Sequence, residues 1–218
     1  MVLSKPYVIM NAAMTLDGKI ATVTGDSSIS SRKDLARVRS LRSKVDAIMV
    51  GINTVLADDP MLIARNTKSR NPIRVIVDSS ARIGLDSRIM RSCGSVNTII
   101  ASSEKASKAK LERIKALDAT TIVLGRSKVD LPRLLAALKQ KGVKKLLVEG
   151  GGEINWSMLA SGLVDEVIVT VAPRIVGGSN AVTLVEGAGF RKINSGIRLK
   201  LRKIAKNGSE VILFYKVV

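Results

Sequence analysis

Short apolar runs alternate with amphipathic segments along most of the chain. Residues 47–51, 74–78 and 145–149 are runs of strand length that are rich in Val, Ile, Leu and Met. Such runs are typical of a parallel sheet that helices cover on both faces, so we expect a three-layer α/β fold with a mostly parallel central sheet. The same pattern predicts further strands at 6–13, 98–101, 121–125 and 166–172, and helices at 108–117, 131–141 and 153–161.

The segment that follows Ser31 has the pattern of an amphipathic helix. Ser31 and Asp34 have the spacing that begins a capping box, in which a hydroxyl and an acidic side chain satisfy backbone N–H groups of the first turn. Leu35, Val38 and Leu41 then fall on one face of the helix, and charged residues occupy the rest.

The end of the chain differs from the rest. Residues 197–202 alternate strictly between apolar and basic, Asn207-Gly208 follows, and residues 211–215 are apolar or aromatic. Asn-Gly between two such runs predicts an antiparallel hairpin. Because no long linker or internal repeat interrupts the pattern, the simplest organisation is a single domain of residues 1–218.

Composition adds limits on location and chemistry. The chain has 218 residues, of which 46% are hydrophobic and only 2% aromatic, so it can bury a core that is mainly aliphatic. No apolar run approaches the roughly 18 residues of a membrane span, and the first residues do not resemble a signal peptide. We therefore expect a cytoplasmic protein without membrane association.

Histidine is absent, and Cys93 is the one cysteine. An internal disulfide is therefore excluded, as are Ser-His-Asp and Cys-His catalysis, and the common zinc sites lack their ligands. Any chemistry must use carboxylates, hydroxyls, Lys, Arg or a bound cofactor.

The net charge of +18 raises the possibility of a nucleic-acid partner. The basic residues are interspersed with apolar ones, however, and the chain has only one Trp, two Tyr and two Phe on which bases could stack. A generally basic surface, or one that attracts anionic small molecules, is the favoured interpretation.

Three consecutive glycines, 150–152, stand between an apolar strand and a helix. A turn of this kind directs free backbone N–H groups and the positive end of a helix dipole at the strand end, which favours an anion. A Rossmann site would instead require Gly or Ala at the position of Asn155 and an acidic residue about 20 residues later, and the chain has neither. A tight turn explains one glycine, whereas three favour contact with a phosphate.

Polar residues also follow two other strands. Thr54 and Asp58 come after residues 47–51, where α/β proteins bind ligands, although Asp58 and Asp59 would equally suit a turn before Pro60. The motif V-D-S-S-A-R, at 77–82, ends in an arginine suited to phosphate, and an ordinary polar loop is the alternative. In M-T-L-D-G-K, at 14–19, Asp-Gly predicts a turn, and the lysine after it is placed to reach an anion.

These four motifs occur together and in this order in the reductases of riboflavin biosynthesis, which the chain resembles. It is most similar to the stand-alone archaeal type that acts on 2,5-diamino-6-ribosylamino-4(3H)-pyrimidinone 5′-phosphate. With G-L-V-D-E-V-I-V-T-V-A-P-R-I-V-G-G, the matching motifs span residues 7–178. The resemblance implies a dihydrofolate-reductase-like fold, a homodimer, and transfer of a hydride from NADPH, or from NADH, that reduces the ribosyl group to ribityl. In bacteria this domain is fused to a zinc deaminase, whose H-x-E and P-C-x-x-C motifs this chain lacks.

The resemblance also implies roles for individual residues. It places cofactor contacts at Ala13, Thr54, Asp58, Ser79, Ser80, Arg82, Val129, Gly150, Gly151, Gly152 and Glu153. It places substrate contacts at Lys19, Ser27, Arg42, Leu62, Arg65 and Glu149, although the run S-S-I-S-S lacks the aromatic residue of the bacterial pattern. The proton donor is left open among Asp58, Glu149, Lys19 and water. The remaining alternatives are a related reductase with another pterin-like or carbonyl substrate and a basic nucleic-acid-binding protein.

Overall fold

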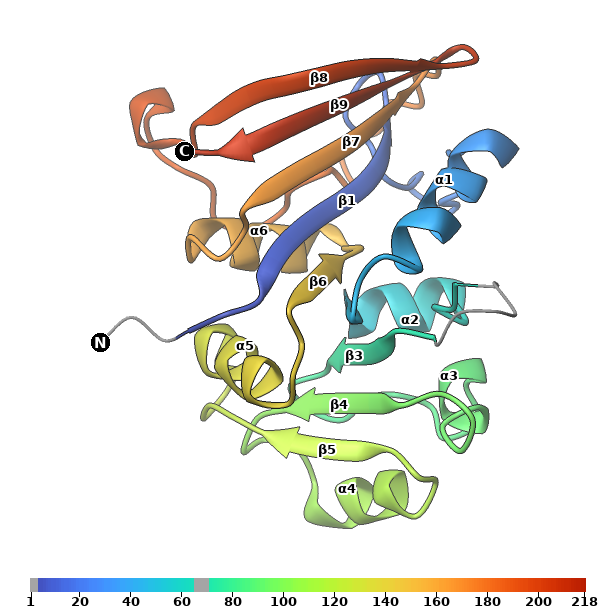
Figure 1. Ribbon diagram of the computed structural model, residues 1–218, viewed down its shortest axis with the longest axis vertical. Helices are drawn as coiled ribbons and strands as arrows, with labels where there is room; N and C mark the ends of the chain where they lie inside the picture. Colours follow the sequence, from blue (N-terminus) through green and yellow to red (C-terminus); the bar gives the residue numbers. More distant parts are fainter. Residues whose placement is uncertain (1–3, 65–70) are drawn as a thin grey trace. The chain divides into compact units, whose positions relative to one another are not determined.

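The chain forms two compact units, each built from segments far apart in the sequence (Figure 1). The computed structural model describes residues 4–64 and 71–218. The first unit comprises Met1–Tyr7 and Arg39–Leu147, and the second comprises Val8–Val38 and Val148–Val218. The organisation of the whole chain as a single domain stays a prediction.

The first unit contains strands in the order β5-β4-β3-β2-β6. The pairs β2–β3, β3–β4 and β4–β5 are parallel, and every residue of β2 and β4 is buried, as expected for strands without a polar face. These strands are β2 (Ala47–Gly51), β3 (Ile73–Val77), β4 (Thr98–Ser102), β5 (Thr120–Val123) and β6 (Lys145–Val148). The helices are α2 (Ile52–Asp58), α3 (Arg88–Arg91), α4 (Lys108–Lys115) and α5 (Leu131–Gln140).

Two of these helices, α2 and α3, are absent from the sequence-based assignment. α2 begins directly after β2, and its N-cap, Gly51, makes no side-chain capping bond, so the usual start signal is missing. Its sequence also contains β-branched Ile52, Thr54 and Val55, which have modest helix propensity. α3 is only four residues long. By contrast, α5 carries clear signals, since Asp130 accepts a hydrogen bond from the Arg133 N–H and a proline stands in its first turn.

A fully buried arginine, Arg74, joins β3 to β4 and α3. Its Nε and Nη2 atoms donate to Thr98 Oγ1 at 2.9 and 2.6 Å, and Nη1 donates to Ser92 Oγ at 2.8 Å. The backbone oxygens of Met61, Ile89 and Val96 accept further hydrogen bonds. Burial lowers the pKa of Arg74. Carbonyl and hydroxyl oxygens therefore solvate this cation within the unit.

The second unit contains strands in the order β1-β7-β9-β8. β1 and β7 are parallel, whereas β9 is antiparallel to both β7 and β8. The elements are β1 (Tyr7–Thr15), β7 (Glu166–Ala172), β8 (Leu199–Asn207), β9 (Glu210–Val217) and helix α6 (Gly152–Ala160), with a short 3-10 helix at Ile193–Ser195. The C-terminal hairpin turns at Gly208, which has a φ of +68°. The expected α/β class, with a mostly parallel arrangement of strands and a C-terminal antiparallel hairpin, is confirmed.

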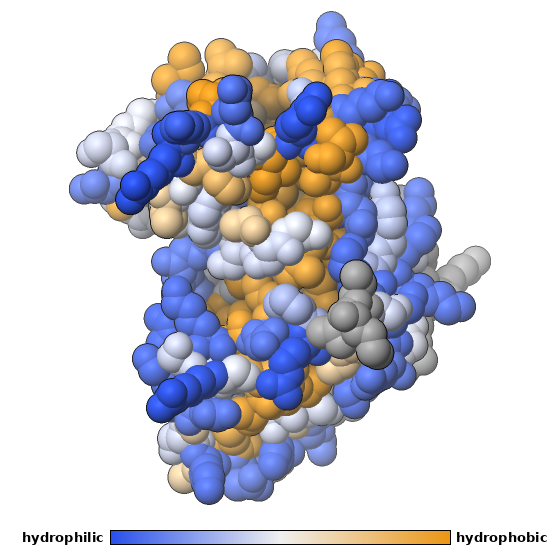
Figure 2. Space-filling model, turned by 90° about the vertical axis from the view of Figure 1, so that its left-hand side faces the viewer, coloured by the Kyte–Doolittle hydropathy of each residue, from blue (hydrophilic) through white to orange (hydrophobic). Residues whose placement is uncertain are grey.

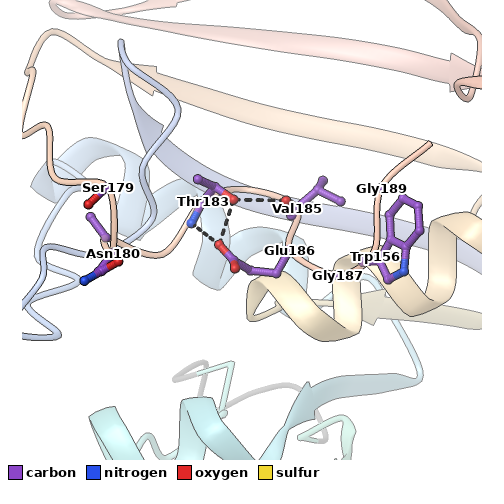
Figure 3. Close-up of a pocket in the computed structure, with 9 residues that line it drawn as sticks. Trp156, Ser179, Asn180, Thr183, Val185, Glu186, Gly187 and Gly189 are labelled. Carbon is purple, nitrogen blue, oxygen red and sulfur yellow. Dashed lines mark hydrogen bonds between the residues drawn. The ribbon is translucent and has the colours of Figure 1, made fainter. Parts of the chain in front are cut away.

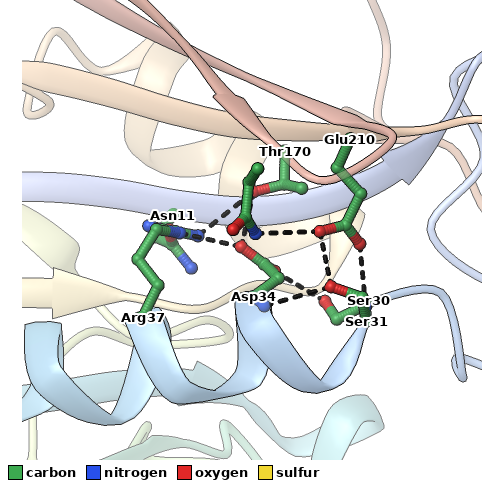
Figure 4. A network of polar contacts seen from close by, with 8 residues as sticks. Asn11, Ser30, Ser31, Asp34, Arg37, Thr170 and Glu210 are labelled. Atoms are coloured by element: carbon green, nitrogen blue, oxygen red, sulfur yellow. Dashed lines mark hydrogen bonds and ion pairs between the residues drawn. The ribbon is translucent and has the colours of Figure 1, made fainter.

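Helix α1 (Arg32–Arg42) buries an acidic residue, Asp34. The carboxylate accepts hydrogen bonds from Ser30 Oγ at 2.8 Å and from Thr170 Oγ1 at 2.8 Å, and Arg37 Nε forms an ion pair with it at 2.8 Å (Figure 4). Arg37 Nη2 donates a further hydrogen bond to Asn11 Oδ1 at 2.9 Å. This network fastens α1 to β1 and β7. Leu35, predicted on the apolar face of this helix, is 43% exposed, whereas Asp34 is fully buried.

The N-terminus of α1 is capped from the far end of the chain. Ser31 Oγ accepts from the Asp34 N–H at 3.2 Å, as a capping box requires. The reciprocal bond comes from Glu210 instead of Asp34. Glu210 Oε1 accepts from the Ser31 N–H at 2.8 Å and Oε2 accepts from the Ser31 hydroxyl at 2.6 Å. The first residue of β9 thus completes the cap, which local sequence could not reveal.

The surface mixes apolar and polar side chains. Figure 2 shows one face, on which hydrophobic residues reach the surface among hydrophilic ones. Among the large hydrophobic residues, Ile193, Ile175 and Leu16 are 94%, 72% and 65% exposed. Within residues 4–64 and 71–218, no helix has the length and apolar character needed to cross a bilayer.

Candidate functional site

The motif M-T-L-D-G-K forms a closed turn at the end of β1, here called the Lys19 turn (Thr15–Lys19). The Thr15 N–H donates to Lys19 O at 2.8 Å, and Thr15 Oγ1 accepts from the Lys19 N–H at 3.0 Å. Asp17 Oδ2 accepts from the Gly177 N–H at 2.7 Å. A hydrogen bond from Thr15, followed by those of the Gly177 and Val176 amides, lowers the pKa of Asp17. The predicted turn is therefore confirmed, and it leaves the Lys19 side chain half-buried with its ammonium 3.3 Å from Ala181 O.

The glycine loop, residues 150–152, leads from β6 into α6, and its glycines serve different purposes. Gly150 has a φ of +85°, which disfavours any residue with a Cβ. Gly151 is the N-cap of α6 and makes no side-chain capping bond. A Cβ on Gly152 would lie 2.4 Å from Glu186 Cγ and 2.8 Å from Thr183 O, so this position is filled by the protein itself. Tight packing thus explains Gly152, while Gly150 and Gly151 leave the first amides of α6 without a side-chain cap.

A buried amide lies beside this loop. Asn155 is fully buried on α6, and its Nδ2 donates to Leu184 O at 2.8 Å. Its Oδ1 has no hydrogen-bond partner among the described residues. Glu149, which precedes the loop, is half-buried, and Glu153 in the first turn of α6 is exposed.

In the first unit, α2 carries Thr54, which is half-buried, and Asp58, which is exposed. The neighbouring Asp59 has a structural role, because its Oδ1 accepts from the Arg88 N–H at 2.9 Å. Arg82 reaches the first turn of α2, where its Nη2 donates to Asn53 Oδ1 at 2.7 Å. The structure therefore brings two of the predicted motifs, 51–60 and 77–82, into contact.

Ser79 connects the end of β3 to the loop before α5. Its Oγ accepts from the Val129 N–H at 3.2 Å, and its backbone oxygen accepts from Ser103 Oγ at 2.8 Å. Ser79 and Val129, both expected near the adenosine end of a cofactor, are therefore in contact. The Val129 side chain is only 8% exposed, so it can offer a ligand little beyond its backbone, whereas Ser80 is exposed.

Two further buried polar atoms lie at this edge. Asp78 and Ser102 follow Val77 and Ala101, which are paired across β3 and β4. Both residues are fully buried, and Asp78 Oδ1 and Ser102 Oγ lack a hydrogen-bond partner in the part of the chain described.

The residues expected to hold the substrate are only partly brought together. Arg42 Nη1 donates to Ile63 O at 3.3 Å, so it lies beside Leu62 in the first unit. Leu62 is 2% exposed and has a φ of +48°, which leaves its backbone rather than its side chain for a ligand. Ser27 is exposed in the second unit, as is Asp26, whose pKa is lowered by the Ser28 amide. Arg65 lies outside the described residues. Ala13 is half-buried on β1, opposite Thr170.

A pocket of about 570 Å³ in the second unit was not anticipated from the sequence (Figure 3). Trp156 of α6 lines one side, and Thr183 and Glu186 line another. Glu186 stands in the tripeptide V-E-G at 185–187, which repeats the V-E-G at 148–150. This repeat is the one sequence signal that could have indicated Glu186.

The sequence also matches known proteins over nearly its whole length. A family model described as the RibD C-terminal domain matches residues 6–213. The chain belongs to this family. It is 48% identical over 216 residues to the 2,5-diamino-6-ribosylamino-4(3H)-pyrimidinone 5′-phosphate reductase of Methanothermobacter thermautotrophicus, covering 98% of this chain and 99% of the relative.

Solved structures agree with this family assignment. Acinetobacter baumannii RibD, form 2, superposes with a TM-score of 0.85 at 27% identity, over 98% of this chain and 58% of that chain. Dihydrofolate reductase from Enterococcus faecalis superposes with a TM-score of 0.56 at 10% identity, over 97% of this chain and 96% of that chain, and so shares the fold. The resemblance to the riboflavin-biosynthesis reductases and the dihydrofolate-reductase-like fold are both confirmed.

Proposed function

We propose that this member of the RibD C-terminal domain family reduces 2,5-diamino-6-ribosylamino-4(3H)-pyrimidinone 5′-phosphate to its ribitylamino product with NADPH, a step of riboflavin biosynthesis. The observation that carries this proposal is the 48% identity, over almost the full length of both chains, to a reductase of that name. We further propose that the chain acts as a single cytoplasmic reductase domain and forms a homodimer.

The glycine loop fits the pyrophosphate of NADPH. The first turn of α6 has no side-chain cap, so its backbone amides suit the oxygens of an anion. The unpartnered Oδ1 of Asn155 lies beside the same loop, 3.8 Å from the point where a Cβ of Gly150 would stand. We assign Gly150, Gly151, Gly152 and Glu153 to this part of the cofactor.

The first unit offers groups for the other parts of NADPH. Arg82 is exposed next to α2, and a guanidinium matches phosphate geometry, which supports NADPH rather than NADH. We assign Ser79, Ser80, Arg82 and the Val129 backbone to the adenosine phosphate. We assign Thr54, Asp58 and the Ala13 backbone to the nicotinamide side.

When bound, NADPH supplies a hydride, so the protein must align the substrate and place one proton. Lys19, Arg42 and Arg65 are cations suited to the sugar 5′-phosphate, and Glu149 can accept hydrogen bonds from the pyrimidine amino groups. Ser27 and the Leu62 backbone complete the proposed substrate contacts. We propose that the proton comes from Lys19, Asp58, Glu149 or water, because the chain has no histidine for this role.

The test combines the purified protein, NADPH and the ribosylaminopyrimidine phosphate, with loss of NADPH absorbance and mass spectrometry of the product as readouts. A product that carries two hydrogens more than the substrate supports the proposal. NADPH binding without turnover of this substrate, together with turnover of dihydrofolate, would assign a different substrate. Absence of NADPH binding would refute the assignment of the cofactor.

A further inference from the structure

The segment 181–186, here called the bridging segment, is paired with the Lys19 turn. Lys19 and Thr183 form an antiparallel bridge. On either side of them, the Ile20 N–H donates to Val182 O at 2.8 Å and the Leu184 N–H donates to Gly18 O at 3.0 Å. The Lys19 ammonium donates to Ala181 O at 3.3 Å, so its position follows that of the bridging segment.

The other side of the bridging segment is fixed to the glycine loop. The Glu186 N–H donates to Gly152 O at 3.1 Å, and Leu184 O accepts from Asn155 Nδ2 at 2.8 Å. Glu186 Cγ fills the space that a Cβ on Gly152 would need. A single six-residue segment thus contacts both the lysine expected to act on the substrate and the loop expected to hold the cofactor.

Glu186 folds back onto the residue that pairs with Lys19. Its Oε1 accepts from the Thr183 N–H at 2.6 Å and from Thr183 Oγ1 at 2.7 Å (Figure 3). The Thr183 amide, its hydroxyl and then the positive charge of Lys19 lower the pKa of Glu186. The acid of the Lys19 turn itself, Asp17, is directed to the amides of residues 176 and 177 instead. Glu186 is therefore a carboxylate that is fixed on Thr183, the residue that pairs with Lys19.

We propose that Glu186 is a positioning residue that, through Thr183 and the bridging segment, orients the Lys19 ammonium and keeps it in register with the glycine loop. Only the expected effect on catalysis rests on the proposed function, which assigns Lys19 to the reaction. The influence of Glu186 on Lys19 can be measured without any turnover.

The first test measures the reactivity of Lys19 by trace acetylation with acetic anhydride and peptide mass spectrometry. Glu186→Gln leaves only a neutral oxygen for the Thr183 amide and hydroxyl, and hydrogen bonds to a neutral acceptor are weaker than those to a carboxylate. The bridging segment should therefore be held less firmly, and Lys19 should be acetylated about threefold faster or more than in the unchanged protein. Glu112→Gln is the matched control, because it removes the same charge beside Lys115, with which Glu112 pairs at 2.8 Å on α4. It should change the labelling of Lys115 and leave that of Lys19 unaltered. Equal Lys19 labelling in Glu186→Gln and the unchanged protein would overturn the proposal.

The second test separates positioning from a purely structural role. Glu186→Gln should lower kcat about tenfold and change the KM for NADPH by less than about twofold. Glu186→Asp, which keeps a charged acceptor for Thr183, should recover most of kcat if the carboxylate positions Lys19 through the bridging segment. If Glu186 only supports the fold, Glu186→Gln should instead lower kcat less than Glu186→Asp does. If the unchanged protein does not turn over the pyrimidine, the proposed function fails, and the labelling experiment still decides the role of Glu186.

Discussion

The candidate residues are held differently in the two units. In the second unit, the Lys19 turn, the bridging segment and the glycine loop are joined mainly by backbone hydrogen bonds, such as Glu186 N–H to Gly152 O. In the first unit, side chains make the corresponding connections, as in Arg82 to Asn53, Ser79 to the Val129 amide, and Arg74 to α3 and β4.

This difference determines which substitutions each region tolerates. Where backbone groups make the contacts, loss of a side chain costs little stability, but an added Cβ can separate two segments. Where side chains make the contacts, truncation leaves buried donors or acceptors without partners. The following substitutions test this contrast, from the largest expected effect to the smallest.

Arg74→Met should give the largest loss of stability. The substitution keeps an apolar side chain of similar length but removes the N–H groups that donate to Thr98 Oγ1, Ser92 Oγ and Met61 O. Each buried acceptor left without a hydrogen bond costs about 1–3 kcal/mol. We expect the free energy of unfolding, measured in urea, to fall by about 3 kcal/mol. Arg91→Met, at an exposed position of α3, is the control and should change it by less than about 0.5 kcal/mol. A fall of less than about 1 kcal/mol in Arg74→Met would mean that side-chain connections do not dominate in the first unit.

Gly152→Ala tests the region built from backbone contacts. The new methyl group would meet Glu186 Cγ and Thr183 O, and overpacking of this kind costs about 1–3 kcal/mol. Because the methyl group must push the bridging segment from the glycine loop, NADPH affinity should also fall. Gly142→Ala is the control: it has a φ of +87° but nothing within 4 Å, so it should lose about 1 kcal/mol through backbone strain and keep its NADPH affinity. Equal effects of the two variants on NADPH binding would contradict the crowding argument.

Ser79→Ala should have a smaller, local effect. It removes the oxygen that accepts from the Val129 N–H, and we expect the free energy of unfolding to fall by about 1 kcal/mol. The amide of Val129 should exchange with deuterium faster. The adjacent Ser80→Ala, at an exposed position, should change neither stability nor exchange at Val129. If the two variants behave alike, Ser79 does not hold the loop before α5.

The smallest effect concerns pH. The folded-state pKa of Glu186 is lowered from 4.5 by the Thr183 amide, its hydroxyl and Lys19, so the ionised carboxylate favours the folded state. This contribution is present above pH 4.5 and is lost as the pH falls through the lower folded-state pKa. Thermal unfolding at a series of pH values should therefore show the Tm of the unchanged protein approaching that of Glu186→Gln below pH 4.5. A difference in Tm that stays constant down to acid pH would exclude ionisation of Glu186 as the cause.

Much of the fold follows from local pattern. Buried strands such as β2 consist of apolar runs, and Asn207-Gly208 marks the hairpin, because both signals depend on neighbouring residues alone. The sequence does not predict α2, because the start of this helix has no side-chain cap. The pattern of α1 places Leu35 on the apolar face, whereas the fully buried residue is Asp34.

The candidate site was predictable as a set of motifs but not as a set of contacts. The glycine loop was expected to bind an anion, yet the need for glycine at 152 depends on Glu186, which lies 34 positions later. Glu210 likewise caps α1 through a hydrogen bond from the Ser31 N–H, 179 positions earlier in the chain. Such partners meet only through the fold, so no local pattern identifies them.

The cap that Glu210 places on Ser31 has a consequence for synthesis of the protein. All residues of the first unit have been made once residue 147 is added, whereas β1 must wait for β7 and the cap of α1 must wait for Glu210. During translation β1 therefore emerges before its partner β7, and the start of α1 stays without the cap from Glu210 until 179 further residues have been made after Ser31. A chain that stops before the hairpin would keep the residues of its first unit and the pairing of β1 with β7, but its first helix would lack the cap that Glu210 provides.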